Sequence, residues 1–416
     1  MEILDKQKIK ITFLAGYYEP DVSADSHLNS SLCNGLAERG YDVTVVAPFP
    51  CRGIDEATRI SFLNKKNKTN EYGVKIFRTG ASKFHKDIIN RCIDFIYKTY
   101  KLYKTAKNIP TDIYIIMSTP PFLGLLGKFL PQASKKIYRL QDIFPDNVVK
   151  IGMTKEGSYL FNILKIFENN IYKNNDLIVT VSKDMRKQLL SRGIPDNKVA
   201  VVYNWIDEKE CYYISKRENF LFDKYSIDKK KFIALYAGNI GYMQQVDTIV
   251  YAANILKDNN DVFFAIVGDG ACKQEIENLI KKLNLQNIKI YPLQPMNLVS
   301  YVYSLGDVGL VSLKSGVSKL ALPSKTWSIM SASRPVICEI DDYSEMNDII
   351  KQNDCGFTCL PKDAKTMAEN IGKLYNDEKL RKSMGENSRK FILQKIRQEA
   401  GIDEFCKIIN KLMGAE

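Results

Sequence analysis

Few residues in this chain have a type and spacing that indicate a chemical role. The clearest signal is a positively charged segment at a predicted helix start. The segment LPSKTWSIMSASRPVI (322–337) places Pro323 and Ser324 where a helix can begin and adds Lys325 in its first turn. Free backbone N–H groups and the helix dipole favour an anion at such a helix start. Alternatively, Ser324 only caps the helix and Lys325 is a solvated surface charge. The segment therefore predicts either an anion site or a simple cap.

Two further groups could act as acids or bases, and both lie in the first half of the chain. Gln141 and Asp142 end the segment KKIYRLQD (135–142), and Asp142 could orient or deprotonate a hydroxyl group. The same carboxylate could instead cap a helix or close a turn. His27 is one of two histidines, and a lone histidine is more often structural than functional. Asp146 is a weaker candidate.

Metal and dinucleotide chemistry find little support in the sequence. Nine cysteines are scattered without a CxxC pair, and two histidines are too few for the usual zinc spacings. The glycine turns read GYYEPD, GNIGYM and GDGACK, and none has the GxGxxG pattern of a dinucleotide site. A P-loop motif and a DxD motif in a suitable loop are also absent. We therefore expect no metal and no bound cofactor, and the scattered thiols fit a reducing cytoplasm.

The bulk composition describes a large globular protein with a basic surface. A chain of 416 residues exceeds one ordinary core, so two or three domains are expected. Hydrophobic residues make up 45% and charged residues 26%, as in folded proteins. The net charge of +12 indicates an anionic membrane, a phosphorylated substrate or nucleic acid as partner, or it only aids solubility. Nucleic acid is disfavoured, because no dense basic run with interleaved aromatic residues occurs.

Short β-branched runs alternate with helical patterns, and the alternation restarts once along the chain. The predicted strands are 8–16, 41–48, 112–118, 135–142 and 176–182, and then 232–241, 263–270, 287–293, 307–313 and 334–340. Such alternation with helical segments is typical of a parallel sheet covered by helices on both faces. We therefore predict two doubly wound α/β domains, residues 1–200 and 201–395, and a C-terminal helix at 396–416 that can pack back on the first domain.

The glycine turns fall at the carboxyl ends of predicted strands, where doubly wound domains bind their ligands. AGYYEP follows the first strand, while AGNIG and VGDG follow the first two strands of the second domain. If the two domains face each other, these turns line a central cleft. We expect a phosphate-bearing ligand in that cleft.

Taken together, these segments resemble the retaining glycosyltransferases of GT-B fold. The motifs, in order, are LAERGYDVTVVAP, ALYAGNIGYMQQVDTIVYAA, IVGDGACKQEI, DVGLVSL, and LPSK followed by RPVI. More narrowly, the chain resembles family four (glycosyltransferase group 1), whose members build bacterial O-antigen, lipopolysaccharide and capsule repeat units. RLQDIFPD and LPSK are similar to the WbuB-type subgroup, which is associated with N-acetyl-fucosamine-like sugars. The resemblance spans the whole chain, and the order of the motifs is more specific than any one of them.

The resemblance implies a nucleotide-sugar donor, UDP-linked rather than guanosine-linked, on the second domain, and an acceptor on the first. The donor diphosphate would meet the amides of Ser324 and Lys325, and Gly16 would be a glycine because a side chain there would meet the diphosphate. The implied donor-binding residues are Gly16, Gly238, Asn239, Gly241, Gln244, Gly268, Leu293, Ser324, Lys325 and Ser328. The implied catalytic residues are Asp142, Gln141 and His27.

The sequence departs from the family pattern around the expected diphosphate. Two glutamates that flank this helix in the family are replaced by Leu320 and Ser328, so the ribose lacks its usual carboxylate partner. An arginine and a lysine after the second-domain glycine turn are replaced by Asn239 and Gln244, which bond phosphate without charge assistance. The candidates for the missing positive charge are Lys319 and Lys325.

The resemblance also implies metal-independent transfer with retention, in which the departing phosphate helps to deprotonate the acceptor. The implied acceptor is an undecaprenyl-diphosphate-linked sugar at the inner face of the plasma membrane. Residues 82–108 mix lysines with Ile, Phe, Tyr and Leu at helical spacing, which suits a helix lying on an anionic bilayer. An ordinary amphipathic helix packed on the sheet has the same pattern. We expect a cytoplasmic protein that is peripheral at the membrane.

Two other functions fit parts of the sequence. A sugar-nucleotide 2-epimerase of the same fold would need other acid–base residues and would give its product without an acceptor. A non-catalytic nucleotide-sugar-binding protein is compatible with the missing glutamates and the missing Arg/Lys pair. Hydrolysis or transfer of the donor distinguishes an enzyme from such a binding protein.

Overall fold

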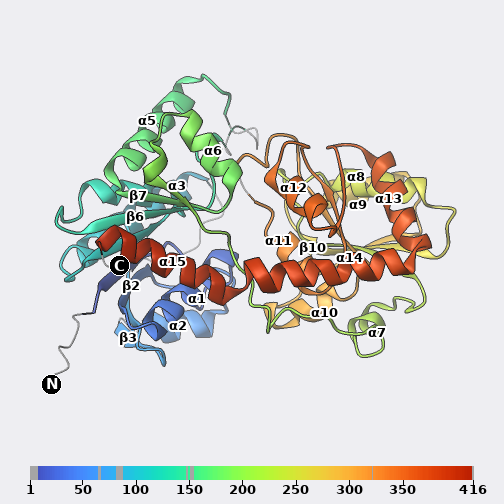
Figure 1. Cartoon of the computed structure of the whole chain (residues 1–416), viewed down its shortest axis with the longest axis horizontal. Helices are drawn as coiled ribbons and strands as arrows, with labels where there is room; N and C mark the ends of the chain where they lie inside the picture. The colour runs from blue at the N-terminus through green and yellow to red at the C-terminus, as the bar shows by residue number, and fades with distance from the viewer. Residues whose placement is uncertain are drawn as a thin grey trace. The chain divides into compact units, whose positions relative to one another are not determined.

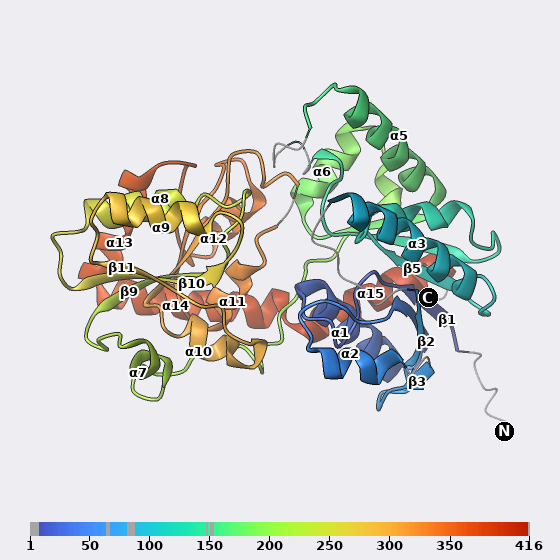
Figure 2. The same ribbon diagram turned by 180° about the vertical axis from the view of Figure 1, so that it is seen from behind.

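The chain folds into two compact α/β units, each with its own sheet (Figures 1 and 2). The computed structural model describes residues 8–63, 67–80, 88–146, 149, 154–320 and 322–414. Residues 1–203 and 401–416 belong to the first unit, and residues 204–400 form the second. The predicted pair of doubly wound α/β domains is confirmed, and below each unit is described by itself.

The first unit is built on an eight-stranded sheet in the order β3-β4-β2-β1-β5-β6-β7-β8. β3 pairs antiparallel with β4, and the other neighbouring pairs are parallel. The strands are β1 Lys10–Leu14, β2 Asp42–Pro48, β3 Asn67–Thr69, β4 Lys75–Thr79, β5 Ile113–Met117, β6 Lys135–Leu140, β7 Leu177–Thr180 and β8 Val199–Val201. Phe13 of β1 lies opposite Val45 of β2 and Ile115 of β5, and all three are fully buried. Apolar, β-branched runs form these strands because helices cover both faces of a parallel sheet.

Serine caps fix where several helices of the first unit begin. The side chains of Ser23, Ser158 and Ser182 accept hydrogen bonds from the backbone N–H groups of Ser26, Phe161 and Met185. Such bonds satisfy donors that lack partners in the first turn of a helix. The helical segments are α1 Ala24–Glu38, α2 Glu56–Leu63, α3 Ile88–Ala106, η1 Pro121–Lys128, α5 Tyr159–Asn174, α6 Lys183–Ser191, η2 Asp196–Lys198 and α15 Gln398–Met413.

The second unit has a six-stranded sheet in the order β11-β10-β9-β12-β13-β14, in which all neighbours are parallel. The strands are β9 Phe232–Asn239, β10 Val262–Asp269, β11 Ile288–Tyr291, β12 Val308–Ser312, β13 Val336–Glu339 and β14 Gly356–Cys359. The chain moves outward from β9 to β11 and returns to the other side of β9 with β12. The strand order therefore reverses between β9 and β12, where the crevice of such a sheet lies.

Helices cover both faces of the second sheet. Side chains of α8, α9 and α13 form one core with β9 and β10, and those of α7 and α10 form another. The helical segments are α7 Leu221–Tyr225, α8 Val246–Ile255, α9 Lys273–Lys282, η3 Met296–Leu298, α10 Val299–Tyr303, α11 Lys325–Ser331, α12 Glu345–Gln352, α13 Ala364–Asn376, α14 Glu378–Phe391 and η4 Ile392–Ile396. The short helix α11 begins at Lys325, close to the start that the sequence predicted.

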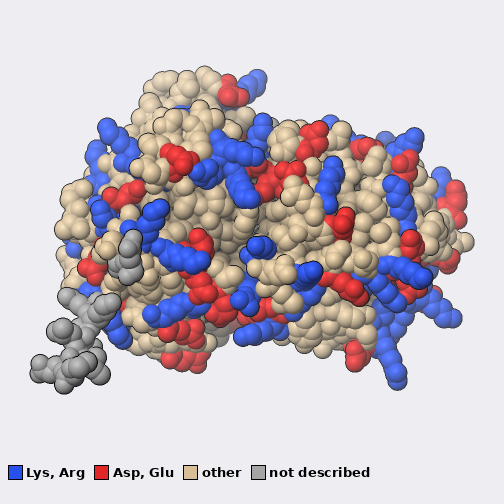
Figure 3. Space-filling view, viewed as in Figure 1, with Lys and Arg blue, Asp and Glu red and all other residues tan. Residues whose placement is uncertain are grey.

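Positive and negative charges are mixed on the face of the molecule that Figure 3 shows. Figure 3 shows Lys and Arg side chains interspersed with Asp and Glu over the visible face. Within the described ranges, no helix combines the length and the apolar character that crossing a bilayer requires. The positive net charge is thus spread among acidic residues on this face.

Candidate functional site

At the carboxyl ends of β9 and β10, two glycines allow the two backbones to approach closely. Gly238 and Gly268 lie opposite each other in the parallel pairing. A Cβ atom added to Gly268 would lie 2.2 Å from the Gly238 carbonyl oxygen, which no side chain could tolerate. Gly238 has a φ of 131°, a conformation that favours glycine. The turn after β9 is therefore held at the switch point of the sheet by close backbone packing.

Lys325 places a cation beside this turn. Its Nζ donates a hydrogen bond of 2.7 Å to the hydroxyl of Tyr236 on β9 and lies 4.0 Å from the ring centroid. A Cβ atom on Gly238 would lie 3.3 Å from the same Nζ. Lys325 is half-buried, and burial lowers the pKa of its ammonium group to about 7. The structure thus brings together two of the predicted donor-side residues, Gly238 and Lys325.

The neutral residues that follow the turn contact one another. Asn239 donates from Nδ2 to Oε1 of Gln244 over 3.3 Å. A Cβ atom on Gly241 would lie 2.5 Å from the same Asn239 amide nitrogen, so Gly241 leaves room for this bond. Asn239 is exposed and Gln244 is half-buried. The predicted trio Asn239, Gly241 and Gln244 therefore forms one polar turn.

A large hollow adjoins this polar turn at the carboxyl ends of β9, β10, β12 and β14. Its volume is about 860 Å³, and Gly241 and Gln244 line it. It also carries two cations and two carboxylates, namely Lys314, Lys362, Asp247 and Glu275. The second unit thus offers space for a ligand beside the residues predicted to bind the donor.

The start of α11 differs from a simple cap. Ser324 is exposed, has the helical dihedrals φ −60° and ψ −25°, and makes no side-chain capping bond. Ser328 is half-buried, and its side chain interacts with the hydroxyl of Tyr303. Leu293, after β11, is 61% exposed. Ser328 therefore has a protein partner, whereas Ser324 and Leu293 face solvent.

Of the two lysines considered for the missing charge, one lies at the glycine turn. Lys319 is exposed and its Nζ sits 4.4 Å from the ring centroid of Tyr343. Lys325 instead approaches Gly238. Leu320, which stands where the family has a glutamate, is 4% exposed and packs inside the unit. The geometry favours Lys325 as the source of positive charge.

Two buried carboxylates that the sequence did not single out shape the loops of this unit. Glu339 accepts hydrogen bonds from Thr248 Oγ1 at 2.9 Å, Ser312 Oγ at 2.6 Å and the backbone N–H of Lys362 at 2.6 Å. Burial raises its pKa to about 7. Asp341 accepts bonds from Ser315, Gly316 and Ser318, which hold the loop before α11. An acidic residue within the apolar run VICEI (336–340) is the signal that could have identified Glu339.

In the first unit, Gly16 has a structural reason to be a glycine besides the one predicted. A Cβ atom at Gly16 would lie 2.3 Å from the carbonyl oxygen of Thr119 and 2.4 Å from Cδ of Pro120. Gly16 is buried, and protein backbone fills the space that a side chain would need. The close loop after β5 is one reason for a glycine here, and the approach of Gly16 to a donor diphosphate stays a prediction.

Asp142 and Gln141 lie just beyond the end of β6. The Gln141 backbone N–H donates a 2.9 Å bond to Ser118 Oγ, which ties the end of β6 to that of β5. Asp142 is in contact with solvent, yet protein crowds its carboxyl group, and this desolvation raises its pKa to about 6. The nearby carboxylate of Asp25 raises that pKa further. A carboxyl group that titrates near neutral pH can exchange a proton with a hydroxyl.

Asp25 was missed by the sequence analysis, although it belongs to the same group. It lies in the first turn of α1, and burial raises its pKa while Thr119 and Arg139 lower it. His27 is two residues further on, about 200° around the helix from Asp25. The structure therefore associates Asp25 rather than His27 with Asp142. An acidic residue in the first turn of a helix usually interacts with the helix dipole. The position of Asp25 in the sequence therefore gives no sign that it acts on Asp142.

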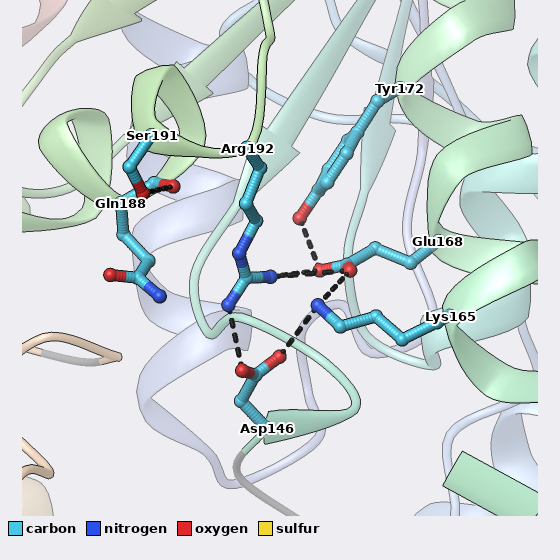
Figure 4. Close-up of polar contacts among 7 residues, drawn as sticks. All are labelled: Asp146, Lys165, Glu168, Tyr172, Gln188, Ser191 and Arg192. Atoms are coloured by element: carbon cyan, nitrogen blue, oxygen red, sulfur yellow. Dashed lines mark hydrogen bonds and ion pairs between the residues drawn. The ribbon is translucent and has the colours of Figure 1, made fainter. Parts of the chain in front are cut away.

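The loop after β6 is anchored by a network of charges (Figure 4). Arg192 donates to Asp146 Oδ1 at 2.7 Å and to Glu168 Oε1 at 3.1 Å. Lys165 contacts the same two carboxylates at 3.1 and 2.6 Å, and the Tyr172 hydroxyl donates to Glu168 at 2.8 Å. Asp146, the weaker acid–base candidate, is thus engaged with two cations and fixes the loop that carries Asp142.

Metal-binding groups are spread through both units. In the part of the chain that the structure describes, no three His, Cys, Asp or Glu side chains come together as metal ligands. Most of the free cysteines described are buried, including Cys33, Cys338 and Cys355.

Comparison with known families assigns the class of protein. The family model "Glycosyltransferase Family 4" matches residues 29–210, and "Glycosyl transferases group 1" matches residues 217–391. The chain also resembles sucrose-phosphate synthase of Thermosynechococcus elongatus, with a TM-score of 0.76 and 15% identity over 98% of this chain and 100% of that chain. It resembles Anabaena HepE in complex with UDP, with a TM-score of 0.71 and 14% identity over 97% and 100%.

Curated relatives agree with this class. "Probable glycosyltransferase WbjE" of Pseudomonas aeruginosa is 25% identical over 73% of this chain and 75% of that protein. The N-acetylgalactosamine-N,N'-diacetylbacillosaminyl-diphospho-undecaprenol 4-alpha-N-acetylgalactosaminyltransferase of Campylobacter jejuni is 21% identical over 85% and 90%. The chain belongs to the GT-B glycosyltransferases of group 1 and family 4.

Proposed function

We propose that this enzyme transfers a sugar from a UDP-linked donor, with retention, to a lipid-diphosphate-linked saccharide. The donor sugar we propose is an N-acetylated deoxy-hexose such as N-acetyl-L-fucosamine, as the similarity to WbuB-type sequences implies. The observation that carries the proposal is the position of Lys325 beside the Gly238 turn. A cation at the switch point of this sheet suits the leaving diphosphate of a nucleotide-sugar.

The proposed donor site consists of the Gly238 turn, the polar turn of Asn239 to Gln244, and the start of α11. Lys325 would offset the charge that develops on the diphosphate as the sugar leaves. Asn239 and Gln244 would add neutral hydrogen bonds. Support for UDP comes from the similar fold of HepE, which was crystallised with UDP.

The proposed acceptor side is the carboxyl edge of the first sheet. Asp142, with a pKa of about 6, would orient the acceptor hydroxyl and take up its proton, aided by the departing phosphate. Gln141 would support the same loop, and His27 is the alternative residue on α1. The lipid-diphosphate acceptor is supported by the name of the Campylobacter relative, which includes diphospho-undecaprenol.

One experiment tests the proposal as a whole. Purified protein is incubated with single UDP- and GDP-sugars and a polyprenyl-diphosphate N-acetylglucosamine analogue, without added metal and with a chelator. Mass spectrometry should show one new disaccharide from a UDP donor, and proton NMR should show that its anomeric configuration matches that of the donor. A product with the opposite configuration would refute retention, and activity confined to GDP donors would refute the choice of UDP.

The same assay separates the two rival functions. A 2-epimerase would convert the UDP-sugar in the absence of acceptor and leave its sugar–phosphate bond intact. A non-catalytic binding protein would bind UDP and give neither transfer nor hydrolysis. Either pattern in place of a disaccharide would exclude the transferase.

We also propose that the protein is cytoplasmic and rests on the inner membrane face through the outer face of α3, defined by Ile93, Ile96, Tyr97 and Tyr100. These side chains are 60%, 60%, 44% and 52% exposed. Lys101 and Lys104 lie 5.4 and 5.9 Å from the ring centroids of Tyr97 and Tyr100. Apolar side chains beside lysines suit an anionic bilayer. The opposite side of α3 packs inside the unit through Lys98 and Leu102.

Vesicle sedimentation tests this surface. The protein should bind vesicles that contain phosphatidylglycerol and should leave pure phosphatidylcholine vesicles unbound. Replacing Ile93 and Ile96 together by serine should reduce binding at least fivefold. The matched control is Ile255→Ser, at a residue of the second unit that is 51% exposed. Equal loss in both variants would contradict a specific role of α3.

A further inference from the structure

A small cavity of the first unit contains a buried guanidinium group. Its volume is about 230 Å³, and it lies between the loop after β1, helix α2 and the β3–β4 hairpin. Arg78 of β4 lines it together with Tyr18, Phe62 and Lys68. Asp142 is not among the residues that line this cavity, and no sequence motif indicated the cavity.

Arg78 is a charged residue that is buried in β4, near the edge of the sheet. It is 6% exposed, and its Cζ lies 5.5 Å from the ring centroid of Tyr18 and 5.8 Å from that of Phe62. Its Nη1 donates a 3.0 Å bond to the Pro48 carbonyl, and its Nη2 donates to the Glu19 carbonyl. Within the described residues its Nε has no hydrogen-bond partner. A buried donor without a partner is costly, so this group is suited to a further acceptor.

The neighbouring carboxylate is already engaged with backbone. Asp21 Oδ1 accepts 2.7 Å bonds from the N–H groups of both Cys51 and Arg52. Asp21 acts on Arg78 through its charge, which raises the pKa of Arg78, while burial has the larger effect and lowers that pKa to about 10. Arg78 thus remains a cation whose direct partners in the described part of the chain are two carbonyl groups.

Lys68 adds a second cation to the same cavity. It lies opposite Ile76 in the β3–β4 hairpin and is exposed. A neighbouring hollow of about 520 Å³ shares Glu19, Lys68 and Asn70 with this cavity and includes Tyr72. Amide, carboxylate and aromatic groups of this kind suit a sugar ring, and an arginine beside a lysine suits a phosphate.

We propose that the cavity lined by Arg78 and Lys68 binds a phosphate of the acceptor, while the adjoining polar hollow receives the attached sugar. The inference rests on the proposed lipid-diphosphate acceptor and names where the first unit recognises it. Arg78 lines the cavity and would attract the phosphate through its positive charge, and Lys68 can close over the anion from solvent. The rings of Tyr18 and Phe62, whose centroids lie 5.5 and 5.8 Å from the Arg78 Cζ, limit the access of water to the guanidinium.

Binding of inorganic pyrophosphate, measured by isothermal titration calorimetry, tests the cavity without requiring catalysis. Wild type and Lys325→Met should bind pyrophosphate with similar affinity at this cavity, and Lys68→Ala should weaken the binding at least fivefold. The control is Lys75→Ala, at a residue of the same hairpin that pairs with Asp42 on the surface; it should bind as wild type does. Arg78→Lys should bind more weakly, and its melting temperature shows whether it folds.

Transfer kinetics provide a second readout. In Lys68→Ala the KM for the diphosphate-linked acceptor should rise at least fivefold, while the KM for the UDP-sugar and its slow hydrolysis stay unchanged. Pyrophosphate binding that is absent in wild type, or lost in Lys325→Met and kept in Lys68→Ala, would overturn the proposal. If pyrophosphate binds as expected and no transfer occurs, the proposed function fails while the anion site stands.

Discussion

The ammonium group of Lys325 lies 2.7 Å from the hydroxyl oxygen of Tyr236 and 4.0 Å from the centroid of the same ring. This contact holds the lysine against the end of β9, next to the backbone of Gly238. The family's usual cations after this glycine are replaced here by Asn239 and Gln244. A positive charge can therefore be supplied from α11 rather than from the glycine turn itself.

Replacing Lys325 by methionine removes the charge and keeps most of the side-chain volume. We expect kcat to fall about 10²–10³-fold, as when one stabilising group for a leaving anion is lost. The reason is that the departing diphosphate loses its cation. Steady-state kinetics with saturating acceptor measure the effect. Thermal stability should stay equal or rise, since a partly buried charge is removed, and near-normal kcat in a folded variant would refute the role.

Donor affinity should depend on pH near neutrality. Burial lowers the pKa of Lys325 to about 7, so the ammonium group is charged below that pH and loses its proton above it. We therefore expect the Kd for UDP to increase as the pH rises through this value. Calorimetric titrations across the range measure it. Lys325→Met should lack this step, and an identical pH profile in the variant would assign the step to another group.

Lys325 should also make the free energy of unfolding depend on pH. Its folded pKa of about 7 lies below the ordinary value of 10.5, so the unfolded chain binds this proton more tightly. The contribution of Lys325 to the free energy of unfolding therefore rises with pH between these two values. Urea denaturation at several pH values, with wild type compared with Lys325→Met, isolates that slope. If the stability of wild type minus that of Lys325→Met falls as the pH rises from 7 to 10.5, the sign is contradicted.

Asp142→Asn should reduce kcat about 10²–10⁴-fold, because an amide cannot take up the proton of the acceptor hydroxyl. In wild type the rate should fall as the pH drops below about 6, where the Asp142 carboxyl becomes protonated. Asp25→Asn should move this acidic limb to lower pH, since the Asp25 charge raises the pKa of Asp142. The measurement is the pH dependence of the transfer rate for wild type, Asp142→Asn and Asp25→Asn. An unmoved limb in Asp25→Asn would show that the two carboxyl groups are not coupled.

Arg192→Ala should loosen the loop that carries Asp142. The guanidinium joins Asp146 and Glu168, and the Glu168 side chain is 4% exposed. We expect a loss of about 1–2 kcal/mol in the free energy of unfolding and a raised acceptor KM. Chemical denaturation and acceptor kinetics measure these.

A matched control lies on the neighbouring α6. Arg186 pairs with Asp196, whose side chain is 72% exposed. Arg186→Ala should cost less than about 1 kcal/mol and leave the acceptor KM unchanged, because exposed pairs are screened by water. Arg192→Lys should recover part of the loss. Equal effects of Arg186→Ala and Arg192→Ala would mean that the network has no special role.

The central strands could be predicted because their apolar residues indicate that both faces of the strand are buried. Runs such as Ile113–Met117 and Phe232–Asn239 are apolar and end at turns, which is typical of buried parallel strands. The β3–β4 hairpin and β14 were not predicted. β3 reads NKT and is exposed throughout, and β14 reads GFTC, with a glycine and a threonine among its four residues, so neither has enough apolar pattern to be recognised.

The candidate site was less accessible to sequence reasoning. Lys325 was identified because its charge stands at a helix start, and Asp142 because it follows a strand. Asp25 and Arg78 gave no signal, because the position of each relative to loops far away in the sequence decides what it does. Gly16 was identified from the glycine turn after the first strand, but its close contact with the loop after β5 gave no signal: the carbonyl oxygen of Thr119 lies 2.3 Å from the position of its missing Cβ.

The last helix has a consequence for how the chain is made. Asp403 pairs with Arg39 at 2.7 Å, Asn410 accepts a bond from Tyr41 at 2.8 Å, and Phe405 is fully buried. These partners are separated by more than 350 residues of sequence, so the first 203 residues leave the ribosome well before their final piece has been synthesised. The middle segment of the chain, which is continuous, can fold while the earlier one waits. Chaperones would therefore meet an N-terminal portion with one side of its core open until α15 has been synthesised.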